Sequence, residues 1–164
     1  MAELLPLSGI APEAIEALLD KAFGTDRHER TAYRLRKRSR AIAALSFAIV
    51  DQGSLTGTIQ CWPVRIGAFK LVLVGPVAVD PARQNEGHGR RLMQAMLEAA
   101  AKIGNPPMCM VGDPEYYGRF GFSSELTGNW TLPGPWEPNR LLARIAATPP
   151  LPINGMVEED ADAL

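Results

Sequence analysis

The sequence predicts one α/β domain that contains a mixed, largely antiparallel sheet of about six to seven strands flanked by helices. Its 164 residues suit one domain with one hydrophobic core. The apolar runs at 71–79 and 108–111 enclose a helical pattern over about 88–103, which predicts a right-handed crossover between parallel strands. Residues 43–50 and 54–65 have strand character, and Asp51-Gln52-Gly53 joins them as a hairpin.

The N-terminal part predicts two helices. Apolar residues recur at helical spacing between Pro12 and Phe23, and Pro12 suits a first turn. Gly24-Thr25-Asp26 then ends the pattern, and Asp26 is a suitable N-cap for a second helix over about 27–38.

The centre of the sheet is predicted at 71–79, which is nearly all apolar and therefore suits a strand covered on both faces. Gly75-Pro76 interrupts this run, and proline cannot donate to a ladder, so a bulge or splay is expected there. Gly67-Ala68 makes the preceding turn. The helix over 88–103 is expected to bury one stripe, formed by Leu92, Met93, Met96, Leu97 and Ala100.

The C-terminal part predicts two more strands, at 129–133 and 140–146, separated by Pro133-Gly134-Pro135. We place the domain at 1–148. Residues 149–164 are rich in proline and acidic residues, and we expect them to form a loosely attached tail.

Composition excludes several classes of protein. The net charge is −1, so no nucleic-acid or membrane partner is indicated. No apolar run reaches the ~20 residues of a membrane helix, and the N-terminus lacks the pattern of a signal peptide. Cys61 and Cys109 lie in apolar surroundings and are expected to be buried free thiols in a reducing cytoplasm. No metal-ligand cluster is visible, so we expect no metal cofactor.

The most informative segment is the turn after the strand at 71–79. Its spacing is Gln84-x-x-Gly87-x-Gly89, and it opens the following helix. A helix N-terminus presents unpaired N–H groups and positive dipole charge, which suit a bound phosphate. A dinucleotide fingerprint would require a small residue where Leu92 stands, and no Walker string is present.

A second motif, Gly112-Asp113-Pro114-Glu115-Tyr116-Tyr117-Gly118-Arg119-Phe120-Gly121-Phe122, follows the strand at 108–111. Together the two motifs resemble those of the GNAT N-acetyltransferases, in the right order and spacing over about residues 71–122. The second motif is similar to that of a bacterial branch of predicted N-acetyltransferases.

The resemblance implies the GNAT acyl-CoA N-acyltransferase fold, splayed at its central parallel pair, with acetyl-CoA as co-substrate. Gln84, Gly87, Gly89 and the backbone N–H groups of 85–90 would bind the pyrophosphate. The side chains of Asn85, Glu86 and His88 would matter less, and Arg90 could neutralise phosphate charge. Backbone groups of Val77, Ala78 and Val79 would bond the pantetheine arm and polarise the thioester carbonyl.

By the same resemblance, Tyr117 is the candidate general acid. A tyrosine pKa of about 10 keeps the hydroxyl protonated at neutral pH, so it can donate to a departing thiolate. Asp113 is the best placed of few candidates for the general base, although Asp-Pro is also a common turn start, and a water chain is an alternative.

The acceptor is expected to be an amine of a small molecule or peptide, which would attack the thioester directly without an acetyl-enzyme intermediate. Seven cations over residues 27–40 indicate either a solvated helix face or an electrostatic funnel for a ligand. The rival function is an acyl-CoA-binding module without transfer activity, and transfer of longer acyl chains is a weaker one. A homodimer stays open.

Overall fold

The computed structural model describes residues 2–146 and 153–161. Two compact units are distinguished within them. The first unit contains the described residues of Met1–Glu29, Ala41–Cys61 and Gly75–Gly104, and the second those of Arg30–Arg40, Trp62–Val74 and Asn105–Leu164. The long strands β3 (Ser54–Ile66) and β4 (Phe69–Val79) belong partly to each unit.

The strands form a mixed sheet in the order β1-β2-β3-β4-β5-β7, with β9 paired to β3, and β6 and β8 form a second pair. The fold class predicted from the sequence is therefore confirmed. In the part of the chain that the structure describes, no helix combines the length and apolarity needed to cross a membrane.

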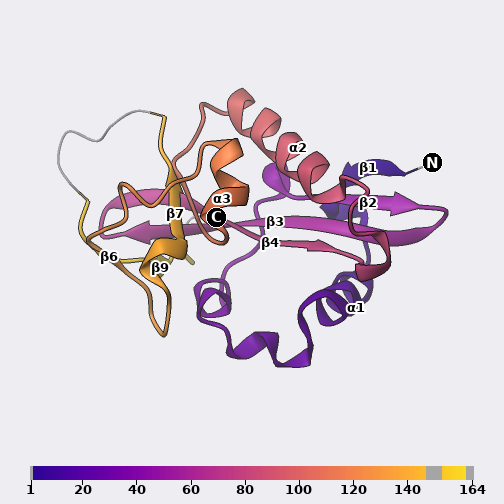
Figure 1. The fold of residues 1–164 in the computed structure, drawn as a ribbon, viewed down its shortest axis with the longest axis horizontal. Helices are drawn as coiled ribbons and strands as arrows, with labels where there is room; N and C mark the ends of the chain where they lie inside the picture. Colours follow the sequence, from indigo (N-terminus) through magenta and orange to yellow (C-terminus); the bar gives the residue numbers. More distant parts are fainter. Residues whose placement is uncertain (1, 147–152, 162–164) are drawn as a thin grey trace. The chain divides into compact units, whose positions relative to one another are not determined.

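In the first unit, three antiparallel strands carry a helix on each side. Strand β1 (Glu3–Pro6) pairs with β2 (Phe47–Asp51), and β2 pairs with β3. The predicted hairpin is confirmed, because Gln52 and Gly53 have φ angles of 51° and 80°, as the turn of a tight hairpin requires. Helices α1 (Pro12–Phe23) and α2 (His88–Lys102) lie on opposite sides of these strands (Figure 1).

Both predicted helices of this unit pack through their apolar stripes. Leu18 and Leu19 of α1 pack against Ala78 of β4. The α2 side chains Leu92, Met93, Met96 and Ala100 are fully buried, whereas Leu97 is only half-buried. A Cβ added at Gly57 of β3 would lie 3.2 Å from Leu92 Cδ1, so the absence of a side chain at Gly57 permits this close approach.

In the second unit, β4 pairs with β5, the strand that follows α2 in the predicted crossover. Strand β5 (Met108–Val111) is parallel to β4, with Val72 opposite Met108 and Leu73 opposite Cys109. Strand β7 (Leu141–Arg144) is antiparallel to β5. The predicted strands at 129–133 and 140–146 are present in shorter form, as β6 (Trp130–Thr131) and β7. The core of this unit comprises Leu35, Val64, Ile66, Leu71, Leu73, Cys109, Trp130, Leu132, Leu141, Ala143 and Val157.

The described residues also contain several short helical elements. They are α3 (Pro114–Tyr117) and the 3-10 turns η1 (Leu7–Gly9), η2 (Thr25–Glu29), η3 (Thr31–Leu35), η4 (Ala43–Leu45), η5 (Pro81–Arg83), η6 (Gly118–Phe120) and η7 (Pro138–Arg140).

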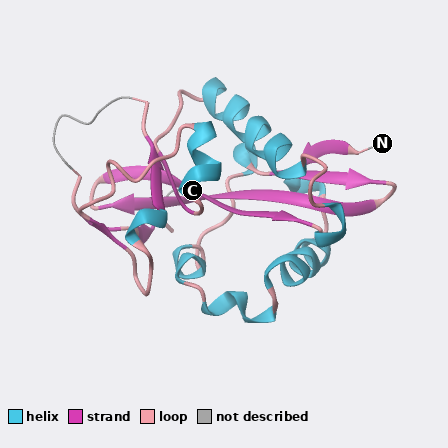
Figure 2. Cartoon of the chain, viewed as in Figure 1, coloured by secondary structure: helices cyan, strands magenta, loops and turns pink. Residues whose placement is uncertain are grey.

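The predicted helix over 27–38 was wrong. Arg30 is extended (φ −71°, ψ 144°) and separates η2 from η3, so Figure 2 shows separate short turns after α1. A continuous helix would stack Arg27, Arg30 and Arg34 at repulsive spacings of three and four residues. Instead, Arg27 is buried and its Nε bonds Asp20 of α1 at 3.0 Å, while its Nη2 bonds Glu16.

Two further expectations need correction. The predicted strand at 43–50 begins only at Phe47, because Ala43–Leu45 form η4. The C-terminal segment is not loosely attached where it is described: β8 (Gly155–Met156) pairs with β6, β9 (Glu158–Glu159) pairs with β3, and Val157 is fully buried. The predicted domain boundary at 148 lies outside the described residues.

Candidate active site

The end of β4 leads directly into the predicted phosphate turn. Ala78 is buried, while Val77 and Val79 are half-buried. The N–H of Asp80 donates to Thr56 O at 2.9 Å, and its carboxylate accepts from the N–H of Ala82 at 3.0 Å. This backbone bond, together with Lys21 and Arg83, lowers the pKa of Asp80. The chain is therefore fixed where it leaves the strand.

The turn itself is exposed and conformationally specific. Gln84, Asn85, Glu86 and Gly87 are all exposed, and Asn85 and Gly87 have φ angles of 70° and 81°. Gly87 is the N-cap of α2 and provides no side-chain hydrogen bond. The helical bonding begins with the N–H of Arg91 donating to Gly87 O at 3.0 Å. The first N–H groups of α2 therefore lack helical acceptors and can bind an anion.

His88 and Arg90, at the start of α2, have different environments. Arg90 is exposed, as a phosphate contact requires, and Gly89 is half-buried. The His88 side chain is only 7% exposed and lies beside Gly57. It is thus a packing residue under the turn, a role that the sequence analysis missed. Its spacing of four residues from buried Leu92 was the available signal.

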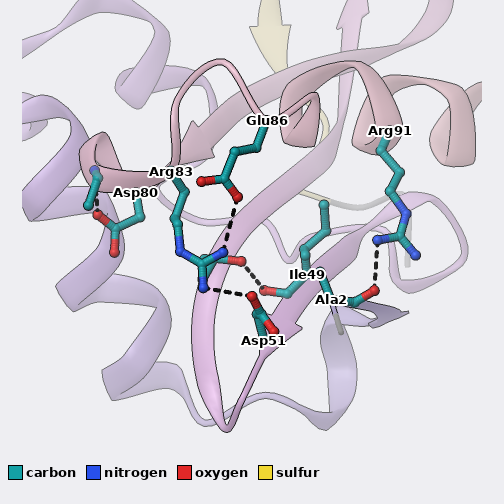
Figure 3. A network of polar contacts seen from close by, with 9 residues as sticks. Ala2, Ile49, Asp51, Asp80, Arg83, Glu86 and Arg91 are labelled. Atoms are coloured by element: carbon teal, nitrogen blue, oxygen red, sulfur yellow. Dashed lines mark hydrogen bonds and ion pairs between the residues drawn. The ribbon is translucent and has the colours of Figure 1, made fainter.

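The structure also reveals Arg83, which the sequence analysis did not select. Figure 3 shows its guanidinium between two carboxylates, with Nη2 at 2.7 Å from Asp51 Oδ2 and Nη1 at 3.2 Å from Glu86 Oε1. These bonds, that to Asp51 above all, raise the pKa of Arg83, and Arg83 lowers the pKa of Asp51. In the first turn of α2, which follows this loop, the Arg91 side chain donates to Ala2 O at 2.9 Å.

In the second unit, α3 carries the predicted acid. The Asp113 carboxylate caps this short helix by accepting from the N–H of Glu115 at 3.0 Å, and Asp113 is exposed. The N–H of Phe122 donates to Tyr117 O at 3.3 Å, and Phe122 is buried. Asp113 therefore has the structural role of a turn start, and its role as a base stays a prediction.

The Tyr117 ring is held by packing on several sides. A Cβ added at Gly112 would lie 2.6 Å from Tyr117 Cε2 and 2.8 Å from Cδ2, so the ring occupies the place of a side chain at 112. Tyr116 meets it edge-on, with ring centroids 4.9 Å apart. Burial raises the pKa of Tyr117 to about 12, while the charge of Arg140 acts in the opposite direction. Tyr117 is therefore a neutral hydroxyl at physiological pH.

The predicted site residues thus fall into two groups. Residues 77–90 belong to the first unit, and Asp113 and Tyr117 belong to the second. Within each group, the structure brings the predicted residues together.

The basic segment over 27–40 is partly neutralised by partners distant in sequence. The backbone N–H and Nε of Arg38 bond the Glu159 carboxylate at 2.8 and 3.1 Å. Arg34 Nη1 donates to Pro133 O at 2.7 Å, and the Arg36 guanidinium lies over the rings of Tyr33 and Trp62. Lys37 and Arg40 are exposed.

Cys61 and Cys109 are buried free thiols, as predicted, and burial raises the pKa of Cys109 to about 12 and that of Cys61 as well. Over residues 2–146 and 153–161, no cluster of three or more His, Cys, Asp or Glu side chains suits a metal ion.

Comparison with known proteins identifies the family. The acetyltransferase (GNAT) domain profile matches residues 11–124. YhbS of Escherichia coli, an uncharacterised N-acetyltransferase, is 32% identical over 124 residues, which cover 74% of this chain and 72% of YhbS. The chain belongs to the GNAT acetyltransferase family.

Solved GNAT structures agree with this assignment. The structure of E. coli YhbS in complex with CoA has a TM-score of 0.71 and 21% identity, and it covers 97% of this chain and 88% of YhbS. A GNAT acetyltransferase from Brucella melitensis in complex with acetyl-CoA has a TM-score of 0.60 and 27% identity, covering 89% of this chain and 97% of that protein. The protein is thus a GNAT N-acetyltransferase, and the resemblance that its two motifs indicated is confirmed.

Proposed function

We propose that this GNAT enzyme binds acetyl-CoA through the turn 84–90 and transfers the acetyl group directly to a primary amine. The observation that carries the proposal is the N-terminus of α2, where exposed Gly87 leaves the first backbone N–H groups without a side-chain cap. Such a helix start binds phosphate through oriented N–H donors and the helix dipole. The relatives YhbS and the Brucella acetyltransferase were crystallised with CoA and acetyl-CoA, which supports the same coenzyme here.

The remaining coenzyme contacts would involve β4. Backbone groups of Val77, Ala78 and Val79 would bond the pantetheine amides and polarise the thioester carbonyl. Because these are main-chain contacts, the apolar side chains can serve the core at the same time. Burial of Ala78 is consistent with this division of roles.

In the proposed reaction, the free amine attacks the thioester carbonyl, and a C–N bond forms as the carbonyl becomes tetrahedral. The intermediate then collapses, the C–S bond breaks, and the Tyr117 hydroxyl donates its proton to the thiolate. Water or Asp113 would accept the proton that the amine loses. The Tyr117 hydroxyl is protonated at neutral pH and can therefore donate, and its raised pKa makes it a weaker acid than an exposed tyrosine.

Direct transfer is favoured over an acetyl-cysteine intermediate by the state of the two thiols. Cys61 and Cys109 are both fully buried, and burial raises their pKa values. A nucleophilic cysteine requires an accessible thiolate. Two reduced, buried thiols are also consistent with our proposal that the protein acts in the cytoplasm.

The acceptor class is tested by screening small amines, amino acids and peptides with acetyl-CoA and by measuring release of the CoA thiol. Turnover with at least one amine, together with a mass gain of one acetyl group on that amine, is the expected result. Tight CoA binding without turnover across the screen would favour the rival acyl-CoA-binding module. A covalent acetyl group on the enzyme would contradict direct transfer.

The coenzyme site is tested with Gly87→Glu, measured by calorimetric titration with CoA. We expect loss of binding, because the carboxylate would repel the pyrophosphate. Gly104→Glu is the matched control, since Gly104 has a similar φ of 92° and is exposed just beyond the opposite end of α2. It reproduces the backbone strain away from the phosphate site. Unchanged affinity in Gly87→Glu, or equal loss in both variants, would contradict the proposed site.

A further inference from the structure

Arg83 occupies a central position in a polar network at the base of the turn. Its guanidinium bonds Asp51 at the end of β2 and Glu86 within the turn (Figure 3). Arg83 and Asp51 are largely shielded, with side chains 27% and 15% exposed, and Glu86 is 47% exposed. Arg83 therefore connects two chain segments more than thirty residues apart.

The turn needs such a connection for a physical reason. Residues 84–87 are exposed, and binding through backbone N–H groups demands that they be ordered in advance. The turn also carries the Glu86 carboxylate, whose charge opposes a bound pyrophosphate. A cation that holds this carboxylate reduces the opposition, and its second bond fixes the turn to the hairpin.

We propose that Arg83 is a positioning residue for the coenzyme: it ties the turn 84–87 to the β2–β3 hairpin through Asp51 and retains the Glu86 carboxylate in an ion pair. The inference rests on the proposed coenzyme site at 84–90. By this inference, Asp51 influences CoA affinity although it lies outside both sequence motifs.

The opposing explanation is that Arg83 acts only through its charge, as one more cation near the phosphates. The two explanations predict opposite effects for Asp51→Asn. If charge alone matters, removing a carboxylate near the turn strengthens the binding of an anion. If Arg83 must be anchored, the same change weakens binding, because the guanidinium loses its charged partner on the hairpin.

The experiment measures the CoA dissociation constant by calorimetry for the full-length protein and its variants at one low ionic strength. We expect Asp51→Asn to weaken CoA binding about two- to fivefold, the range of a partly exposed ion pair. Glu3→Gln is the matched control, because it removes one exposed carboxylate from neighbouring β1 and leaves the network intact. It should bind CoA as tightly as the wild type or slightly more tightly.

A second pair of variants separates geometry from charge. Arg83→Lys retains the positive charge but loses the planar fork that reaches two carboxylates, so it should weaken CoA binding as Asp51→Asn does. Arg83→Ala leaves Glu86 unpaired, and the added change Glu86→Gln should recover part of the lost affinity. Thermal unfolding of each variant confirms that the fold is retained.

Two outcomes would overturn the inference: stronger or unchanged CoA binding in Asp51→Asn, or wild-type affinity in Arg83→Lys. Failure of the proposed coenzyme site has a different signature, which is unchanged affinity in Gly87→Glu. Loss of binding in Gly87→Glu together with unchanged affinity in Asp51→Asn would retain the coenzyme site and reject the role of Arg83.

Discussion

The turn 84–90 and the segment around Tyr117, the two candidate parts of the active site, differ in their local environment. The turn is exposed, it offers backbone N–H groups, and its shape depends on positive φ angles at Asn85 and Gly87. Tyr117 offers one side-chain hydroxyl, whose pKa is raised to about 12 because the ring is desolvated. A backbone site can therefore be predicted from motif spacing, whereas the properties of a side-chain acid depend on its surroundings.

The largest expected effect is that of Tyr117→Phe, which deletes the hydroxyl and keeps the ring. If Tyr117 is the acid, kcat should fall about 10²–10⁴-fold, while CoA affinity at the turn should not change. Steady-state kinetics on a confirmed acceptor and calorimetry with CoA measure the two quantities. Tyr116→Phe is the control and should be nearly silent. Wild-type kcat in Tyr117→Phe, with chemistry shown to be rate-limiting, would remove Tyr117 from the mechanism.

A smaller effect on the same region is expected for Gly112→Ala. The new methyl group would lie 2.6 Å from Tyr117 Cε2, so the ring must move. Because misplacement of a catalytic group by about 1 Å costs up to about 10²-fold, we expect a fall in kcat of about ten- to a hundredfold at unchanged CoA affinity.

Gly128→Ala is the matched control for that change. No atom lies within 4 Å of a Cβ added at Gly128, and its φ is not in the left-handed region. It should leave kcat unaltered. Equal kcat for Gly112→Ala and wild type would show that Tyr117 need not be held in this position.

Tyr117 and Asp51, the partner of Arg83 beside the turn, should lose their contributions to stability at opposite ends of the pH scale. The folded-state pKa of Tyr117 lies above the ordinary value of about 10, so its contribution is complete below pH about 10 and is lost as pH rises to about 12. The folded-state pKa of Asp51 is lowered by Arg83, so its contribution is lost as pH falls through that lowered value. Denaturant unfolding across pH measures both.

Substitutions assign each limb of this stability profile to one residue. Tyr117→Phe should flatten the alkaline limb, and Asp51→Asn the acid limb. An alkaline limb that persists in Tyr117→Phe would contradict the assignment to its hydroxyl.

The smallest expected effect concerns the exposed cations Lys37 and Arg40. Replacing both by Glu should weaken the binding of an anionic acceptor or of CoA a few-fold at low salt. The difference in affinity between variant and wild type should shrink as salt increases. Kinetic constants over an ionic-strength series measure it. If the kinetic constants of the variant match those of the wild type at every salt concentration, the electrostatic funnel is rejected and these cations are only solvated surface residues.

Local patterns predicted a large part of the fold. Helix α1, the β2–β3 hairpin, the crossover from β4 through α2 to β5, and the capped turn at Asp113 all follow from periodicity and turn chemistry. The prediction failed where distant partners compete with local preference. In the segment 27–38, Arg27 is drawn to α1 by Asp20, and Thr31 donates its hydroxyl hydrogen to Pro135 O.

The C-terminal segment shows the same limit. The run Glu158-Glu159-Asp160 is acidic, and composition therefore favoured a solvated end. In the structure, Asp160 is 4% exposed and bonds Lys70 at 2.9 Å, while Glu159 receives Arg38. Each carboxylate finds a cation from another element, and no local pattern encodes such a pairing.

Local sequence patterns indicated the family of this protein, the candidate phosphate turn and the candidate acid, because backbone conformation and motif spacing are local properties. Only the tertiary structure decided that Arg83 joins Asp51 to Glu86, that Gly112 makes room for the Tyr117 ring, and that His88 is buried. These features depend on desolvation and on contacts between segments distant in the chain. Both arise only when the core has formed.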